Sequence, residues 1–312
     1  MGDGFLLGLN LPWIRYGLDF GANRWQPGGG LARPENREAL LRCLDRAAAL
    51  RPGLLRWFLL CDGRAGIRFD ERGDALGLDA HLLPDLDAAI AATRARGLRL
   101  LLVLFDYLWL ARARRRDGVL LGGRRALIAD ARRRERLLET VVAPILERFG
   151  ADPTVAAWEA LNEPEWATLG LGTWDPRKAV GAAVMRQFLG EIAALVHART
   201  SHQVTVGLAS AAALGLARGL GLDFYQVHWY DRLAARAPLE RPVATLALDR
   251  PLLLGEFPTR GSARPPAAIV EAARRAGYSG ALAWSLLAED PASDGAACEQ
   301  ALLDRATGGS NA

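Results

Sequence analysis

The sequence predicts a single (β/α)8 barrel, the TIM barrel of the α/β class. Eight short apolar segments alternate with segments of helical periodicity, and no linker interrupts the series over 312 residues. The apolar run over 98–105 has no polar alternation, which is typical of a parallel strand buried on both faces. The length is ordinary for one barrel, and 51% hydrophobic residues can fill a large core.

The first half of the chain contains four predicted strands, over 5–11, 54–60, 98–105 and 155–161. The helix predicted over 35–50 has apolar residues at helical spacing, and Pro52-Gly53 ends it. The helix over 81–96 ends at Gly97, a usual position for glycine after a helix. A third helix covers 130–149, where Pro144 marks a kink or an early end.

The second half contains strands over 203–209, 223–229, 252–256 and 281–286. The helix over 176–199 has Pro176 in its first turn and Asp175 as its cap. Helices over 267–276 and 296–303 follow, whereas the connections after the fifth and sixth strands are short for full helices. Residues 1–306 form the predicted domain, and residues 307–312 form a short polar tail.

The competing fold is a doubly wound open sheet. Such a sheet usually has a glycine-rich phosphate loop after its first strand, and the segment from Gly8 to Pro12 does not have that pattern. The sequence therefore favours the closed barrel.

Composition excludes several classes of protein. Cys43, Cys61 and Cys298 are scattered and odd in number, so neither paired disulfides nor a thiolate metal site is expected. No apolar run approaches about 18 residues, so we expect no integral membrane segment. The N-terminus shows no signal peptide. We expect a cytoplasmic monomer on the sequence given, and a secreted one if a signal has been removed.

The basic residues are concentrated in one segment. Ten arginines and three acidic residues lie between Arg112 and Arg136, a net charge of +7 in a chain whose net charge is +4. Such a run is usually a solvated face. The alternative is a surface that attracts an anionic polysaccharide or a membrane. Nucleic acid is not an expected partner. Aromatic residues are absent between Ala111 and Phe149, and the rest of the chain is mildly acidic.

Two glutamates fall at the carboxyl ends of predicted strands, where a parallel barrel binds its ligands. Glu163 follows the fourth strand, beside Asn162 and before the strand-breaking Pro164, and Glu256 ends the seventh strand. A pair of carboxyl groups is what cleavage of a glycosidic bond requires.

These motifs resemble those of clan A retaining glycoside hydrolases, and family 5, the cellulase and mannanase family, is the nearest. The matching segments are Asn162-Glu163-Pro164, His228-Trp229-Tyr230 and Gly255-Glu256-Phe257, with Arg56 after the second strand and Trp284 after the eighth. The resemblance implies Glu163 as the acid/base, Glu256 as the nucleophile and Asn162 as a ligand of the sugar 2-hydroxyl. The chain departs from the family near the end of the third strand, where many members have a histidine and this chain has Asp106-Tyr107.

The surroundings of the two glutamates should divide their roles. We expect Arg56 and Tyr230 to keep Glu256 ionised, while burial and the charge of Glu256 raise the pKa of Glu163. Glu159 lies within the fourth strand and is expected to pair with Arg56 or to be a buried structural ion. Glu165 is the alternative acid, although Pro164 favours Glu163.

Nine tryptophans provide candidate sugar platforms, because flat aromatic rings match the faces of pyranose rings. We expect Trp284 to lie beneath the sugar that is cleaved, with Trp13 nearby. Core packing is expected instead for Trp57 and Trp158.

The sequence therefore predicts a retaining β-glycosidase that hydrolyses a β-glucan or β-mannan type of oligo- or polysaccharide, which can carry negative charge. The predicted substrate contacts are Asn162, Arg56, His228, Tyr230, Trp284 and Trp13. Four dispersed histidines argue against a metal-dependent hydrolase, so neither a metal nor an organic cofactor is expected. The alternatives are a transglycosylase with the same two glutamates and a non-catalytic glycan-binding barrel.

Overall fold

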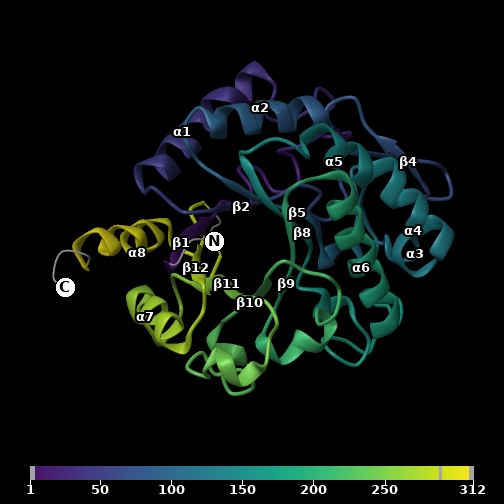
Figure 1. Ribbon diagram of the computed structural model, residues 1–312. Coiled ribbons are helices and arrows are strands. Elements are labelled where there is room, and N and C mark those ends of the chain that lie inside the picture. The colour runs from purple at the N-terminus through teal and green to yellow at the C-terminus, as the bar shows by residue number, and fades with distance from the viewer. Residues whose placement is uncertain (1–3, 288–289, 309–312) are drawn as a thin grey trace.

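The computed structural model describes residues 4–287 and 290–308. A closed barrel of eight parallel strands forms its centre (Figure 1), which confirms the predicted fold class. The strands follow one another around the barrel in chain order, and β12 closes it by pairing with β1. They are β1 (Leu6–Asn10), β2 (Leu55–Phe58), β5 (Leu100–Asp106), β8 (Val155–Asn162), β9 (Gln203–Leu208), β10 (Tyr225–His228), β11 (Leu252–Pro258) and β12 (Gly280–Trp284).

Helices surround most of the barrel (Figure 1). They are α1 (Pro34–Ala49), α2 (Leu82–Arg94), α3 (Arg125–Ala129), α4 (Ala131–Leu137), α5 (Ala143–Phe149), α6 (Ala182–Arg199), α7 (Pro266–Ala276) and α8 (Gly295–Gly308). The connections after β9 and β10 contain only the short 3₁₀ turns η4 (Ala211–Leu216), η5 (Asp231–Leu233) and η6 (Val243–Leu246). Two further 3₁₀ turns, η1 (Tyr107–Trp109) and η3 (Pro164–Ala167), follow β5 and β8. Within the described part of the chain, no helix is long and apolar enough to cross a membrane.

The helix predicted over 130–149 is confirmed at its two ends, but a π-helical turn, η2 (Leu138–Val142), interrupts it just before Pro144, the second residue of α5. Two other predicted helix boundaries are wrong. Helix α6 begins at Ala182 rather than Pro176, because Asp175 accepts hydrogen bonds from Arg112 and Arg177 and does not cap a helix there. Helix α8 extends to Gly308, past the predicted domain end at 306, and residues 309–312 lie outside the described residues.

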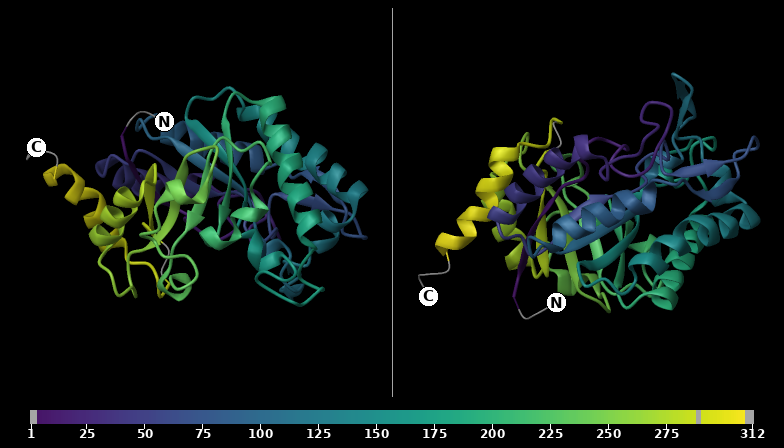
Figure 2. Two further views of the ribbon diagram at one scale, coloured as in Figure 1. Left: turned by 60° about the horizontal axis from the view of Figure 1, so that its bottom comes forward. Right: turned by 90° about the horizontal axis from the view of Figure 1, so that it is seen from above.

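Two hairpins on the loops after β2 and β5 were not predicted. They pair β3 (Ile67–Phe69) with β4 (Ala75–Leu78) and β6 (Arg114–Arg116) with β7 (Val119–Leu121). Figure 2 shows these loop segments beyond one end of the barrel. Strands of three or four residues with exposed arginines have no apolar pattern that sequence reasoning could detect.

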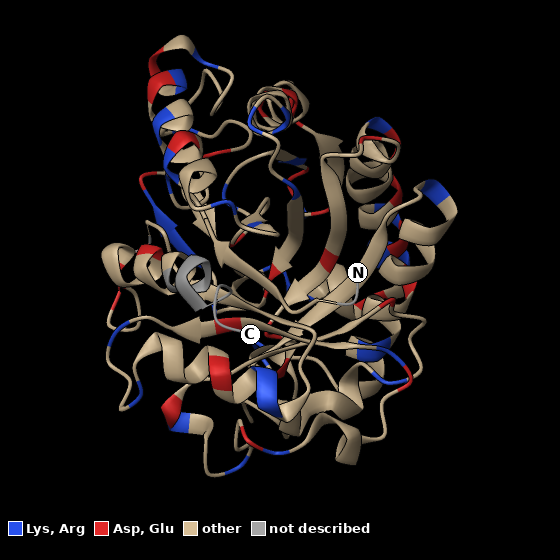
Figure 3. Cartoon of the chain, turned by 60° about the vertical axis from the view of Figure 1, so that its left-hand side comes forward, with Lys and Arg blue, Asp and Glu red and all other residues tan. Residues whose placement is uncertain are grey.

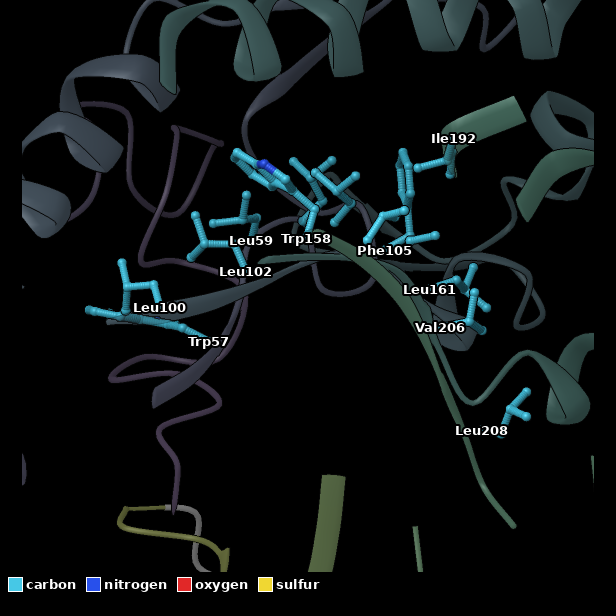
Figure 4. Close-up of a cluster of buried hydrophobic side chains, with 14 of the residues drawn as sticks. Trp57, Leu59, Leu100, Leu102, Phe105, Trp158, Leu161, Ile192, Val206 and Leu208 are labelled. Carbon is cyan, nitrogen blue, oxygen red and sulfur yellow. The ribbon is translucent and has the colours of Figure 1, made fainter. Parts of the chain in front are cut away.

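The core lies between the strands and the surrounding helices. Figure 4 shows part of it, where Trp57, Phe105 and Trp158 meet leucines of the strands and Ile192 of α6. Trp57 and Trp158 are fully buried, which confirms that they pack in the core. Their indole N–H groups donate to Asp19 at 2.9 Å and to His202 at 3.1 Å, so neither buried donor is unsatisfied.

The loop between β1 and α1 is held in place by one carboxylate of α2. Asp85 is 1% exposed and accepts backbone hydrogen bonds from Gly21 at 2.8 Å, Gly30 at 2.7 Å and Ala32 at 2.7 Å. Buried backbone N–H groups need hydrogen-bond acceptors, and a loop has no neighbouring strand to supply them. The carboxylate of Asp85 supplies the acceptors for these three N–H groups.

We expect Asp85→Ala to lower the free energy of unfolding by about 3 kcal/mol, because three backbone N–H groups lose their acceptor. Urea unfolding measures the change. The matched control is Asp87→Ala on the same helix, which removes a surface ion pair with Arg148 and should cost less than about 1 kcal/mol. Equal effects of the two substitutions would contradict the role of Asp85.

Candidate active site

A cavity of about 500 Å³ opens where the carboxyl ends of the barrel strands meet. Most of the residues predicted to contact substrate line it: Trp13, Asn162, Tyr230 and Trp284, together with both predicted catalytic glutamates, Glu163 and Glu256. The topology therefore brings together side chains from five loops or strand ends that are far apart in sequence.

The two glutamates lie close to each other across His228. The imidazole Nδ1 is 3.0 Å from Oε1 of Glu163 and 3.4 Å from Oε2 of Glu256. One oxygen of each carboxylate and this nitrogen all lie within 4.8 Å of one another. Retaining glycosidases have carboxyl groups about 5–5.5 Å apart, whereas inverting enzymes need about 6.5–9.5 Å to admit a water molecule. The geometry matches a retaining mechanism.

Glu163 occupies a specific backbone conformation directly after β8. Its φ of 50° is in the left-handed region, which is uncommon for a residue with a side chain and is often found at functional sites. Its N–H donates to the carbonyl of Gly207 at 2.6 Å, and Oε2 accepts from the indole of Trp166 at 2.8 Å. Pro164 then starts η3, which places Trp166 beside the carboxylate.

Glu256 accepts hydrogen bonds on both of its oxygens. Arg56 Nη1 donates to Oε1 at 2.6 Å, and the hydroxyl of Tyr230 donates to Oε2 at 2.7 Å. These are the two contacts predicted for this carboxylate. Arg56 is itself fully buried and binds both oxygens of Glu159, each at 2.6 Å, which confirms the predicted pairing of Arg56 with Glu159.

Glycine at position 207 is required by this arrangement. A β-carbon there would lie 2.2 Å from Oε1 of Glu159 and 2.8 Å from Nε2 of Gln226, which donates to Glu159 at 2.7 Å. Any larger residue would displace the carboxylate that binds Arg56.

Arg56 and His228 do not line the cavity, contrary to their predicted contact with substrate. Both side chains are 0% exposed and lie behind the catalytic carboxylates. The physical reason is their position on β2 and β10, where they pack into the barrel interior beneath the residues at the cavity surface. Their contacts are with the carboxylates, so they can position and charge them but cannot touch a sugar.

Asn162 is held by polar contacts at both ends of its amide. Its Oδ1 accepts from Arg56 Nη2 at 2.7 Å, and its Nδ2 donates to Oδ2 of Asp106 at 2.7 Å. Asp106 ends β5, near the position where many members of the family have a histidine, and it lines the cavity. Burial raises the pKa of Asp106 to about 8. Its place at a strand end was the available signal, but no role had been predicted for it.

An aromatic wall forms one side of the cavity. Trp13 meets Phe58 and Trp284 edge-on, with ring centroids 6.0 and 6.1 Å apart. The indole N–H of Trp284 donates to Asp290 at 2.9 Å, which fixes the ring orientation. The sequence predicted Trp13 and Trp284 but missed Phe58, because it belongs to an apolar strand and has no polar neighbour that would mark it.

Burial and neighbouring charges together raise the pKa of Glu256 and lower the pKa of Glu163. Burial raises the pKa of Glu256, although His228 and Arg56 oppose the increase. Burial would also raise the pKa of Glu163, but the hydrogen bond and charge of His228 lower it below its ordinary value. The pKa of His228 is raised, because the two carboxylates outweigh the effect of burial.

The expectation that Glu163 alone keeps a high pKa is therefore wrong for the free site. The reason is its hydrogen bond with His228, which the sequence did not reveal. Because Glu163 and His228 are in direct contact, their protonation states depend on each other and the two groups titrate as a pair. Glu165, the alternative acid, is buried outside the cavity lining and accepts from the N–H of Ser210 at 3.3 Å.

The same three side chains form a possible metal-binding group. Among residues 4–287 and 290–308, Glu163, His228 and Glu256 are the group of three whose ligand atoms lie close enough to hold one ion. Their carboxylate oxygens already accept hydrogen bonds from Trp166, Arg56 and Tyr230. The carboxylate oxygens that would bind an ion are consequently engaged in these hydrogen bonds.

Two curated relatives cover almost the whole chain. The mannan endo-1,4-beta-mannosidase of Mytilus edulis is 24% identical, with 90% of this chain and 83% of the relative aligned. The enzyme of the same name from Cryptopygus antarcticus is 25% identical over 93% of this chain and 82% of the relative. The predicted relation to family 5 glycoside hydrolases is confirmed. No family model matches the chain.

Solved structures give the same fold. The endo-1,4-beta-mannanase of Eisenia fetida is 23% identical and superimposes with a TM-score of 0.78, covering 96% of this chain and 90% of that one. The beta-1,4-D-mannanase of Cryptopygus antarcticus is 24% identical, with a TM-score of 0.77 and the same coverage. The barrel fold is thus shared with these enzymes.

Tyr230 generates a prediction for the pH dependence of activity. Glu256 must be ionised to attack, so activity falls as the pH drops through its raised pKa. Tyr230→Phe removes a hydrogen bond that favours the ionised form, so the pKa of Glu256 rises further. We expect the acid limb of kcat/KM to move to higher pH by about one pH unit.

The control is Tyr225→Phe, the same substitution at the first residue of β10, where the hydroxyl donates to Asp249 away from the cavity. Its pH profile should match that of the unsubstituted protein. An acid limb that stays in place or moves to lower pH in Tyr230→Phe would show that Tyr230 does not act on Glu256.

Proposed function

We propose that this protein is an endo-acting retaining β-glycosidase that cleaves β-1,4-linked mannan by double displacement. One observation carries the proposal: two buried carboxylates approach within 4.8 Å at the carboxyl end of the barrel, each with different hydrogen-bond donors. The names of the similar enzymes support β-1,4-mannan as the substrate and endo cleavage as the mode of action.

In the first step, a carboxylate oxygen of Glu256 attacks the anomeric carbon of the sugar. The bond to the leaving oxygen breaks, and the proton of the Glu163–His228 pair passes from Glu163 to that oxygen. Arg56 and Tyr230 orient Glu256 and favour its ionised form against the burial that raises its pKa. Both donors come from side chains held in the fold, so little reorganisation accompanies the reaction.

In the second step, Glu163 is ionised and removes a proton from water. The water oxygen attacks the anomeric carbon, the bond to Glu256 breaks, and the product has the original anomeric configuration. Trp166 and His228 both donate to ionised Glu163, which stabilises it as a base between the two steps. The lowered pKa of Glu163 in the free site suits this second role.

The charges around the cavity favour a neutral glycan. Five acidic residues line it, Asp106, Glu163, Asp231, Glu256 and Asp290, against two basic ones, Arg232 and Arg260. The raised pKa of Asp106 and the contact of Glu163 with His228 reduce the negative charge, but the lining has no excess of basic residues that would attract an anionic polymer. We therefore propose neutral mannan rather than an acidic polysaccharide.

The arginine-rich segment does not contribute to the cavity lining. Arg112, Arg133 and Arg134 pair with Asp175, Asp74 and Glu191, so part of the segment holds the helices and loops together. Arg124 is buried and Arg125 donates to the carbonyl of Ala179, whereas the exposed arginines of β6, the blue strand of Figure 3, form a solvated face.

Replacement of each glutamate tests the proposal. Glu256→Ala should lower kcat on β-1,4-mannan by a factor on the order of 10⁵, because the covalent intermediate cannot form. Azide should restore part of the activity toward an activated aryl β-mannoside and give an α-mannosyl azide. Glu163→Ala should retain activity on good leaving groups, and azide should give a β-mannosyl azide.

The anomeric configuration of the azide products, measured by NMR, separates the two roles. A wild-type rate for Glu256→Ala on an aryl glycoside would contradict the assignment. Product analysis with added acceptor sugars separates hydrolysis from transglycosylation. Binding of mannan without any cleavage by the unsubstituted protein would indicate a glycan-binding barrel instead.

A further inference from the structure

One arginine of the cavity wall has N–H groups that are free to bind a ligand. Arg232 lies in η5, just after β10, and it is exposed and lines the cavity. Its guanidinium has no ion-pair or hydrogen-bond partner among residues 4–287 and 290–308, and its contacts there are with two aromatic rings. The catalytic steps described above do not use this side chain.

The two rings place Arg232 beside the catalytic carboxylates. The central carbon of its guanidinium lies 5.8 Å from the ring centroid of Trp166 and 5.5 Å from that of Tyr230. Trp166 donates to Glu163 at 2.8 Å, and Tyr230 donates to Glu256 at 2.7 Å. Contacts between a cation and an aromatic ring use the charge of the guanidinium, so its N–H groups remain free to donate.

The backbone on both sides of Arg232 is fixed. The carboxylate of Asp231 accepts from the N–H of Ala263, in the loop after β11, at 3.2 Å. The N–H of Leu233 donates to the carbonyl of Tyr230 at 2.9 Å. An exposed side chain on an anchored turn can bind a ligand with little loss of backbone entropy.

The order of the strands places Arg232 on the side of the proton donor. In the ring of eight strands, β9 lies opposite β1, and β8 and β10 are the neighbours of β9. Glu163 follows β8 and Arg232 follows β10, whereas Trp13 of the aromatic wall follows β1. The charge of Arg232 also contributes to the lowered pKa of Glu163. Because Glu163 protonates the leaving oxygen, the leaving sugar lies on this side of the cavity.

We propose that Arg232 is a specificity-determining residue whose guanidinium donates hydrogen bonds to hydroxyl groups of the leaving sugar. The proposal rests on the proposed function, since it requires a mannan chain across the cavity. Hydrogen bonds from a charged donor are stronger than those from a neutral one, and arginine keeps its charge at any working pH. An acceptor sugar that replaces water in the second step enters the same place, so the contact holds an acceptor as well.

Competition between water and an acceptor sugar tests the proposal. The donor is dinitrophenyl β-mannobioside, which forms the glycosyl-enzyme and releases dinitrophenolate, and the acceptor is methyl β-mannobioside. Attack by water gives mannobiose. In transfer, the acceptor hydroxyl gives its proton to Glu163, its oxygen bonds to the anomeric carbon, and the bond to Glu256 breaks. The product is then methyl β-mannotetraoside, and mass spectrometry gives the ratio of the two products.

Arg232→Met removes the N–H donors and keeps an unbranched side chain. We expect the ratio of transfer to hydrolysis to fall about 5–10-fold at a fixed acceptor concentration, because the acceptor loses hydrogen bonds and water does not. Both routes use Glu163 as the base, so a change in its pKa leaves the ratio unaffected. An unchanged ratio, with or without a shifted pH profile, would overturn the proposal.

Arg236→Met is the matched control. Arg236 is also exposed and lies in the same connection after β10, but it is outside the cavity lining. Its product ratio should match that of the wild type. An equal fall in the ratio for the two variants would count against a specific contact of Arg232 and overturn the proposal.

Failure of the proposed function would be visible in the wild type itself, which would cleave neither mannan nor the aryl mannosides. In that case, or where the wild type uses water as its only acceptor, calorimetric titration with mannopentaose decides the question. The titration compares Glu256→Ala with Glu256→Ala/Arg232→Met, so that no cleavage disturbs it. An affinity about 5–10-fold weaker with Arg232→Met would support the contact. Equal affinities, or no binding to Glu256→Ala, would overturn it.

Discussion

The buried guanidinium of Arg56 is the interaction on which the catalytic geometry depends. This one positive charge binds Glu159 through two hydrogen bonds and Glu256 through one, each at 2.6 Å, and also contacts Asn10 and Asn162. Because removal of one partner from a buried ion pair leaves an uncompensated charge, the cost of displacing any of these groups is several kcal/mol. Side chains of β1, β2, β8 and β11 are consequently fixed relative to one another, and the nucleophile is fixed with them.

The acid/base is positioned by a separate set of contacts. Trp166 and His228 bind Glu163, and His228 also approaches Glu256. A neutral or charged imidazole between two carboxylates couples their ionisation, so the proton that leaves with the first product does not belong to one residue. Formation of the covalent bond removes the negative charge of Glu256, which lowers the pKa of Glu163 further. The loss of this charge favours transfer of the proton to the leaving oxygen and keeps Glu163 ionised for the second step.

The barrel and its two glutamates could be predicted because they depend on local patterns. Apolar runs revealed the strands, and Pro164 marked the end of the strand that carries Glu163. The start of α6 could not be predicted, since the contact that removes Asp175 from a helix cap comes from Arg112, on a distant loop. Nor could the lowered pKa of Glu163, which depends on the approach of His228 from another strand.

The most direct test of the account is to identify the residue that becomes covalently attached to the sugar. A 2-deoxy-2-fluoro-β-mannoside with a good leaving group should form a long-lived glycosyl-enzyme, because the fluorine slows both steps and the activated leaving group speeds up only the first. Peptide mapping by mass spectrometry should then locate one sugar on Glu256. A label on Glu163, or inversion of configuration with no covalent adduct when mannan is cleaved, would contradict the assignment of the two carboxylates.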